Sequence, residues 1–405
     1  MQALPEFTEV EFGKRLKNVR ERMVERELDL CLISTSENIF YLTGLDHWGY
    51  FAPHILIVPH QGDMVLVTRA MEKVTVGNQV RNAAFHGHQD NETAADVVVR
   101  LLADRGQAKA RSVAAADAVS EVLERQRATR PRIGLEKWSS GLSHGLAEAL
   151  RDALDAVDWI DVSGMVDELR MIKSPLEQTY MREAALISDH AMLASIDAVG
   201  DGVRERDVAA ECHRAMIQAG GTFPGFGPFI RSTQRLGEEH TSWSDGICQA
   251  GDAVFLELSG CFRRYHAPLG RLIFIGRAPE GTQEMAAVCR DAFEASVEAL
   301  KPGKLTRQVY QAWQDVVDDA GLEHYRRHHC GYMVGIGFPP SWSGGNRVTG
   351  LRHDSELEIK TGMSWHMLSW LMGAGRGDYF ISNTALVGPD GAEVLTKTPI
   401  NVIER

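Results

Sequence analysis

Apolar residues near the start of the chain recur every three or four positions, which predicts an amphipathic helix. Four of them lie on one helical face: Phe12, Leu16, Val19 and Met23. Short apolar runs with the length of strands follow at residues 30–33, 55–58 and 64–67. Helical patterns return at residues 94–102, 120–128 and 142–154, and a strand-like RIGLE separates the last two. This alternation predicts an α/β domain in the first part of the chain.

A change of pattern near residue 165 predicts a boundary between domains at residues 1–165 and 166–405. Ser174 and Pro175 open a long helical pattern, and Glu177 follows directly, as is typical of a helix start. Further helical patterns lie at residues 204–219, 283–300 and 306–320. Strand-like runs lie at residues 253–258, 269–275, 363–371 and 381–387. We therefore expect an α+β second domain with a mostly antiparallel sheet.

Composition and charge narrow the class of protein. The chain has 405 residues, 44% hydrophobic and 24% charged, which is ordinary for a globular protein. A formal net charge of -12 without a dense Lys/Arg run argues against nucleic acid or an anionic membrane as partner. The six cysteines form no CxxC pair, and no apolar stretch is long enough to span a bilayer. These features predict a cytoplasmic protein.

Several segments along almost the whole chain resemble one family. These are ENIFYLTG, RMIKSPLEQTYMREAALISDHAM, GDAVFLELSGCFRRYHAPLGRLIFIG, GLEHYRRHHCGYMVGIGFPP, TGMSWHMLSW and ISNTALVGPDGAEVLT. They are similar, in the same order, to motifs of creatinase, aminopeptidase P and methionine aminopeptidase. The resemblance implies an α+β pita-bread catalytic domain preceded by an α/β creatinase-type domain. It also implies a homodimer.

The metalloenzymes of that family bind two divalent metals through two Asp, one His and two Glu. By the resemblance, these five positions fall on Glu257, Pro268, Tyr332, Leu368 and Ser382. Pro, Tyr and Leu cannot replace carboxylate or imidazole ligands, and one carboxylate cannot hold two hard cations. The resemblance therefore implies an enzyme without a metal or another cofactor. Creatinase is a metal-free member of the same family.

Within that metal-free branch, GYMVGIGFPPSW and WHMLSW resemble the bacterial ectoine hydrolases. These enzymes open the cyclic amidine of ectoine, which carries an amidinium and a carboxylate, to N-acetyl-2,4-diaminobutyrate. The resemblance implies the same small-molecule substrate here. Two alternatives remain: a creatinase-like amidinohydrolase or other small-solute hydrolase, and a non-catalytic protein that binds a solute.

Glu257 and His240 are the candidate catalytic residues. Glu257 interrupts the apolar run VFLEL, where an unpaired carboxylate is costly to bury and an amidinium would be a partner. It could attack the amidine carbon or activate water, or it could only pair with Arg264 or Arg271. His240, in EEHTSW, corresponds to the acid–base histidine of creatinase; the alternative is a solvated loop residue.

The candidate substrate-binding residues are Tyr332, His366, Trp48, Tyr50, Phe51 and Arg271. His366 alternates with Leu368 and should border the same pocket, although a satisfied core histidine is an equally good interpretation. Tyr332 could orient substrate or simply fill space. The segment HWGYF could supply aromatic contacts to an amidinium, from this subunit or from a partner subunit. Arg271 and Arg231 could each bind the substrate carboxylate, or form a structural ion pair.

Overall fold

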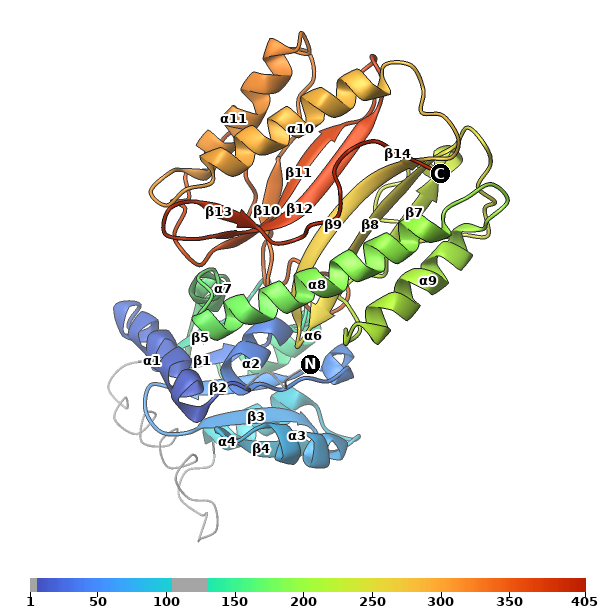
Figure 1. The fold of residues 1–405 in the computed structure, drawn as a ribbon. Coiled ribbons are helices and arrows are strands. Elements are labelled where there is room, and N and C mark those ends of the chain that lie inside the picture. The colour runs from blue at the N-terminus through green and yellow to red at the C-terminus, as the bar shows by residue number, and fades with distance from the viewer. Residues whose placement is uncertain (1–5, 104–129) are drawn as a thin grey trace. The chain divides into compact units, whose positions relative to one another are not determined.

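The computed structural model describes residues 6–103 and 130–405 and divides them into two compact units. The first unit comprises the described part of Met1–Arg170 together with Gly345–Arg347. The second comprises Met171–Gly344 and Val348–Arg405. Each unit is visible in Figure 1. The helix predicted at residues 120–128 lies outside the described residues.

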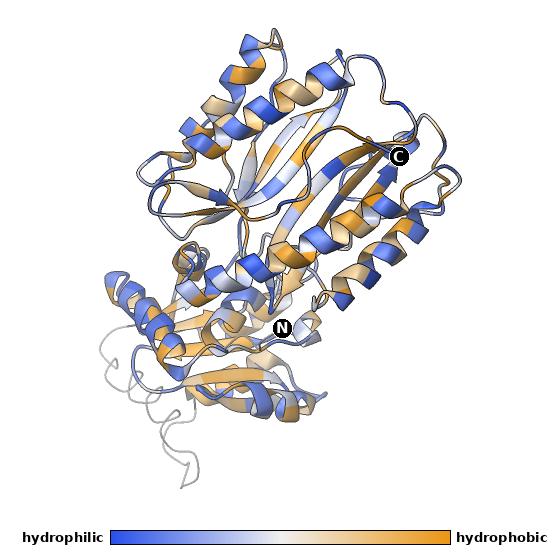
Figure 2. Cartoon of the chain, viewed as in Figure 1, coloured by the Kyte–Doolittle hydropathy of each residue, from blue (hydrophilic) through white to orange (hydrophobic). Residues whose placement is uncertain are grey.

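A six-stranded sheet forms the centre of the first unit, in the order β4-β3-β2-β1-β5-β6. Its strands are β1 (Leu30–Ile33), β2 (Ile55–Pro59), β3 (Met64–Arg69), β4 (Ala83–His88), β5 (Arg132–Leu135) and β6 (Asp158–Asp161). The helices are α1 (Glu9–Glu25), α2 (Ser36–Thr43), α3 (Lys73–Gln79), α4 (Ala94–Ala103), α6 (His144–Ala153) and α7 (Met165–Arg170). Strands β2 and β3 are almost entirely hydrophobic in Figure 2, as expected of strands buried on both faces. The predicted α/β domain is confirmed.

The first unit extends beyond the predicted boundary because α7 is tied to α2. Asn38 of α2 donates to Asp167 Oδ1 at 2.9 Å and accepts from Arg170 Nε at 2.7 Å. The backbone N–H of Asn346 donates to Asp167 Oδ2 at 2.7 Å. Residues 345–347, which the sequence assigns to the second domain, therefore belong to the first unit.

The second unit contains a larger sheet in the order β10-β11-β12-β9-β8-β7. Its strands are β7 (Phe229–Ser232), β8 (Ala253–Phe262), β9 (Tyr265–Phe274), β10 (Gly331–Met333), β11 (Ser364–Leu371), β12 (Tyr379–Val387), β13 (Ala392–Val394) and β14 (Ile403–Glu404). The helices are α8 (Pro175–Ala198), α9 (Glu205–Gln218), α10 (Thr282–Ala299) and α11 (Thr306–Asp319). All pairs along the main order are antiparallel, as predicted. Helix α8 begins at a capping box of Ser174 and Glu177, with Pro175 in its first turn.

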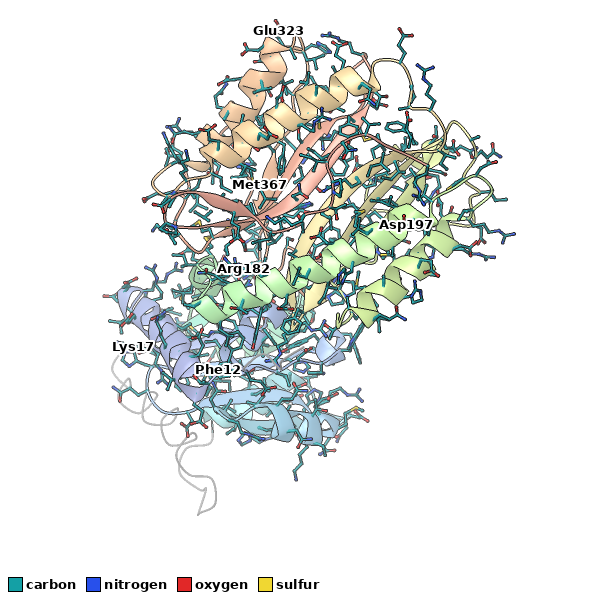
Figure 3. The ribbon with its side chains drawn as sticks, in the orientation of Figure 1. Phe12, Lys17, Arg182, Asp197, Glu323 and Met367 are labelled. Atoms are coloured by element: carbon teal, nitrogen blue, oxygen red, sulfur yellow. The ribbon has the colours of Figure 1, made fainter. Side chains whose placement is uncertain are left out.

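Helices α8 and α10 cover one face of this sheet; α8 runs along β8 and β9, and α10 along β11 and β12 (Figure 1). Leu256 of β8 belongs to the same buried hydrophobic cluster as Ile187 of α8. Cys289 of α10 donates to Ser369 Oγ of β11 at 3.3 Å. Met367, labelled in Figure 3, is fully buried and points the same way as Ser369 because side chains alternate along a strand. We call this surface the helix-covered face.

None of the described helices has both the length and the apolar character of a membrane span. The six cysteines are all buried as free thiols.

Candidate active site

A row of four paired residues crosses the second sheet on the face that points away from α8 and α10. Glu257 pairs with Gly270, Gly270 with Ser382, and Ser382 with Leu368. Directly paired residues point to the same side of a sheet. Leu256 points to the helix-covered face, so its neighbour Glu257 and the whole row point to the other face. We call that surface the site face.

All five positions that the resemblance relates to metal ligands lie on the site face. Pro268 is two residues from Gly270 on β9, and Tyr332 pairs with His366, two residues from Leu368 on β11. Gly270 leaves a gap in the row. A Cβ there would lie 2.3 Å from Phe380 Cε1 and 2.9 Å from Ser382 Oγ, so a larger residue would not fit without movement.

A chain of hydrogen bonds holds His366 beside Glu257. Trp342 Nε1 donates to Tyr332 Oη at 2.8 Å, and Tyr332 Oη lies 2.9 Å from His366 Nδ1. On the other side of the ring, His366 Nε2 lies 2.8 Å from Ser382 Oγ and 3.8 Å from Glu257 Oε1. In one consistent assignment Tyr332 donates to Nδ1 and Nε2–H donates to Ser382. The imidazole is thus held in a fixed orientation against the carboxyl group.

Burial sets the charge state of both groups. It raises the pKa of Glu257 to about 8, with Arg231 opposing the shift and Glu239 adding to it. Burial, together with a smaller contribution from the nearby His329, lowers the pKa of His366 to about 3. Near neutral pH the free protein therefore holds a mostly protonated Glu257 next to a neutral imidazole. A cation that binds beside Glu257 would favour the carboxylate and release its proton.

This pKa predicts how stability depends on pH. Between about pH 4.5 and pH 8 the unfolded chain has lost the proton of Glu257 while the folded chain keeps it. The contribution of Glu257 to the free energy of unfolding therefore falls as pH rises, by at most about 1.4 kcal/mol per pH unit. Since Gln does not titrate, Glu257→Gln should gain stability over the wild type between about pH 5 and pH 8, by roughly 3 to 4 kcal/mol.

Urea denaturation at several pH values measures this difference. Glu280→Gln, at an exposed glutamate of the same unit, is the matched control and should track the wild type at every pH. A constant difference between Glu257→Gln and the wild type would mean that Glu257 is already ionised when the site is empty.

His240 lies in an exposed loop after β7, with a left-handed backbone φ of 51°. Its ring is 6.4 Å from the ring of Phe226 and 6.1 Å from that of Phe229. Phe229 pairs directly with Glu257, and both phenylalanines contact Trp342. An aromatic group thus lies between His240 and the hydrogen-bond chain. A catalytic part for His240 stays a prediction.

Arg271 points away from the site, contrary to its predicted role in substrate binding. It pairs with Leu256 and Ile381 and so lies on the helix-covered face. Its guanidinium is only 1% exposed and donates five hydrogen bonds, to Asn383 Oδ1 and to four backbone carbonyls, those of Gly270, Ser382, Thr398 and Pro399. All five N–H groups are used, so none remains for a carboxylate. Side chains alternate between the two faces along β9, and this alternation puts Arg271 on the helix-covered face.

The three aromatic candidates of the first unit lie around the short 3-10 helix η1 (Gly49–Phe51). Tyr50 donates its hydroxyl to the carbonyl of Leu45 at 3.0 Å, and its ring stacks on His47 at 5.0 Å. Trp48 is 56% and Phe51 84% exposed. Their contact with substrate stays a prediction.

The residues on the site face do not fit a two-metal centre. Glu257 is the carboxylate of the row, and both nitrogens of His366 already have hydrogen-bond partners. Across residues 6–103 and 130–405, no cluster of three or more His, Cys, Asp and Glu side chains could hold a metal ion. Pro268 and Leu368 offer no ligand atom in their side chains. Catalysis without a metal stays a prediction.

Comparison with known families agrees with this architecture. The model of metallopeptidase family M24 matches residues 179–389, just over half of the chain. The chain belongs to metallopeptidase family M24. The model of the creatinase/prolidase N-terminal domain matches residues 15–172. The predicted fold, a creatinase-type domain followed by a pita-bread domain, is therefore confirmed, and the family makes the chain a hydrolase.

Relatives within family M24 carry different activities. The chain is 27% identical to an uncharacterized hydrolase/peptidase of Sinorhizobium fredii, covering 98% of each chain. It is 25% identical to the ectoine hydrolase of Halomonas elongata, covering 97% of each. It is 23% identical to the Xaa-Pro dipeptidase of Pyrococcus horikoshii, covering 96% of this chain and 99% of that one. The prolidase of Thermococcus sibiricus shares the fold, with a TM-score of 0.83, 17% identity, and coverage of 99% of this chain and 100% of that one.

The sequence did not predict two contacts of the site. Ser382 was expected only as a replaced ligand position, yet its hydroxyl contacts His366. Trp342 was one of many aromatic residues, yet its indole anchors Tyr332. A signal for Ser382 exists in the sequence, because it begins the polar run SNT in the middle of the strand YFISNTALV.

Proposed function

We propose that this chain is a hydrolase that opens the cyclic amidine ring of ectoine to N-acetyl-2,4-diaminobutyrate without a metal. The observation that supports this most directly is Glu257, a buried carboxyl group on a sheet face that lacks the other metal ligands of the family. A buried carboxyl with a raised pKa favours a cationic partner that can compensate its charge. The similarity to an ectoine hydrolase over 97% of both chains supports the amidinium of ectoine as that cation.

The proposed reaction begins when the amidinium of ectoine binds beside Glu257 and the carboxyl loses its proton. The carboxylate then attacks the amidine carbon, or it takes a proton from a water molecule that attacks instead. In the first route a bond from Glu257 to the amidine carbon forms as one C–N bond of the ring breaks, and water then hydrolyses that bond and regenerates the carboxylate. In both routes the ring nitrogen leaves as an amine, and one molecule of water is added overall to give the acetyl group. His366 is too firmly hydrogen-bonded on both nitrogens to be the mobile base, so it positions Glu257 and Ser382.

In this proposal the leaving nitrogen receives its proton from His240. His240 lies in an exposed loop after β7, where its imidazole is open to solvent. Tyr332 lies between the aromatic group near His240 and His366 and would contact the substrate ring. The proposal includes a cytoplasmic homodimer in which Trp48, Tyr50 and Phe51 contact the substrate.

The test is a direct assay of purified protein with ectoine. N-acetyl-2,4-diaminobutyrate should form, and a chelator should not lower the rate. Loss of turnover in chelator that returns with added metal would refute the metal-free reaction.

A substrate panel separates the alternatives. Turnover of creatine but not ectoine would favour a creatinase-like amidinohydrolase, and turnover of an Xaa-Pro dipeptide would favour a peptidase. Binding of ectoine without turnover would favour a solute-binding protein. Several relatives are Xaa-Pro dipeptidases, so the dipeptide is a necessary member of the panel.

A further inference from the structure

A second charged group lies on the site face, on the strand next to Glu257. Arg231 of β7 pairs with Phe255 of β8, and Phe229 pairs with Glu257. Because residues two apart on a strand point to the same side, Arg231 and Glu257 share the site face. The guanidinium carbon of Arg231 lies 4.4 Å from the centre of the Phe255 ring.

Arg231 is buried without the hydrogen bonds that a buried guanidinium needs. It is only 1% exposed, and its Nε and Nη1 atoms are buried with no partner. Arg271, equally buried, uses all five of its N–H groups. An unpaired buried charge is costly, and burial lowers the pKa of Arg231 while Glu239 and Glu257 oppose that shift. Such a group is poised for an anionic ligand.

A second arginine lies over the same aromatic surface. The rings of Phe255, Trp370 and Phe380 contact one another with centroids 4.8 to 5.4 Å apart. The guanidinium carbon of Arg327 lies 4.8 Å from the centre of the Trp370 ring, and its Nε atom is also buried with no partner. We call Arg231, Arg327 and these three rings the arginine–aromatic cluster.

We propose that the arginine–aromatic cluster binds the carboxylate of the substrate, while Glu257 binds its cationic ring. This inference rests on the proposed function and narrows the substrate class to small zwitterions. Phe255 is two residues from Glu257 along β8, a separation of about 7 Å, which suits a molecule of a single ring rather than a polymer. The aromatic rings hold the arginines in place and exclude water, so that a carboxylate there meets donors in a medium of low dielectric.

The test compares ectoine with 2-methyl-1,4,5,6-tetrahydropyrimidine, the same cyclic amidine without the carboxylate. Arg231→Met should lower kcat/KM for ectoine by about tenfold or more and change it less than about twofold for the analogue. Arg327→Met should act in the same direction with a smaller effect, because Arg327 is less buried. Arg277→Met, at an exposed arginine of the same unit, is the control and should leave both values unchanged.

Equal losses on both amidines would overturn the inference, because Arg231 would then support the structure alone. Equal kcat/KM of the wild type for both amidines would overturn it too, while the proposed function would stand. If Arg231→Met does not fold, Arg231→Lys and Arg327→Met give the same comparison. Selective loss on ectoine in either variant supports the inference.

If neither amidine is hydrolysed, the proposed function fails. Binding of acetate then tests separately whether the arginine–aromatic cluster is an anion site. Acetate should then raise the Tm of the wild type above its value in chloride at equal ionic strength, and Arg327→Met should lose that rise. An identical Tm in both salts would overturn the anion site.

Discussion

Glu257→Gln is expected to lower kcat for ectoine hydrolysis by at least about a thousandfold without unfolding the protein. Gln keeps the shape of the side chain but can neither attack the amidine carbon nor accept a proton from water. Glu257 is 8% exposed and lies 3.8 Å from His366. In this buried position we expect no other group to take over its role as nucleophile or base. Steady-state kinetics on the purified variant measure the effect.

The control for this variant is Glu280→Gln, which changes an exposed glutamate and should keep the wild-type kcat. The Glu257→Gln variant also tests binding. Its side chain cannot form a carboxylate, so KM for ectoine should rise. If Glu257→Gln retained more than about a tenth of the wild-type kcat, the chemistry would have to reside elsewhere on the site face.

Much of the fold follows from periodicity. The helix α1 begins and ends close to the predicted residues because its apolar residues repeat, and the strands β1 to β3 do so because each is a short apolar run. Helix α8 begins where Ser174 and Pro175 predict. Its capping box is a local signal that needs no tertiary contact to be recognised.

The hairpin of β8 and β9 shows where local signals fail. The apolar runs predict strands at residues 253–258 and 269–275, whereas the strands continue to Phe262 and begin again at Tyr265. The turn between them consists of Arg263 and Arg264, both with positive φ. Such a turn usually carries Asn or Gly, so two arginines give no turn signal.

The site was predictable as far as it depended on single strands. Glu257 stands out because a charge interrupts an apolar run, and His366 because it alternates with Leu368. The contact between His366 and Ser382 depends on the register of β11 against β12. The row from Glu257 to Ser382 depends on β9 pairing with both β8 and β12. No local pattern encodes those registers.

Arg271 is a different case, because alternation along β9 places it on the helix-covered face, and its substitution carries the largest expected effect on stability. Arg271→Met should lower the free energy of unfolding by about 3 to 5 kcal/mol, since it removes a buried charge whose five hydrogen bonds satisfy Asn383 and four backbone carbonyls. Although burial lowers the pKa of Arg271 to about 10, the guanidinium is charged at neutral pH. Arg277→Met, at an exposed site, should change stability by less than about 0.5 kcal/mol.

Urea denaturation measures the loss, and kinetics on the folded fraction tell a structural role from a role in binding. Because Arg271 lies on the helix-covered face, the folded fraction of Arg271→Lys should keep the wild-type KM for ectoine while losing stability. Arg231→Met should show the opposite pattern, with a raised KM for ectoine and a smaller change in stability, because it removes a guanidinium that lacks partners. If Arg271→Lys raised KM without loss of stability, Arg271 would bind the carboxylate and the assignment of the two faces would be wrong.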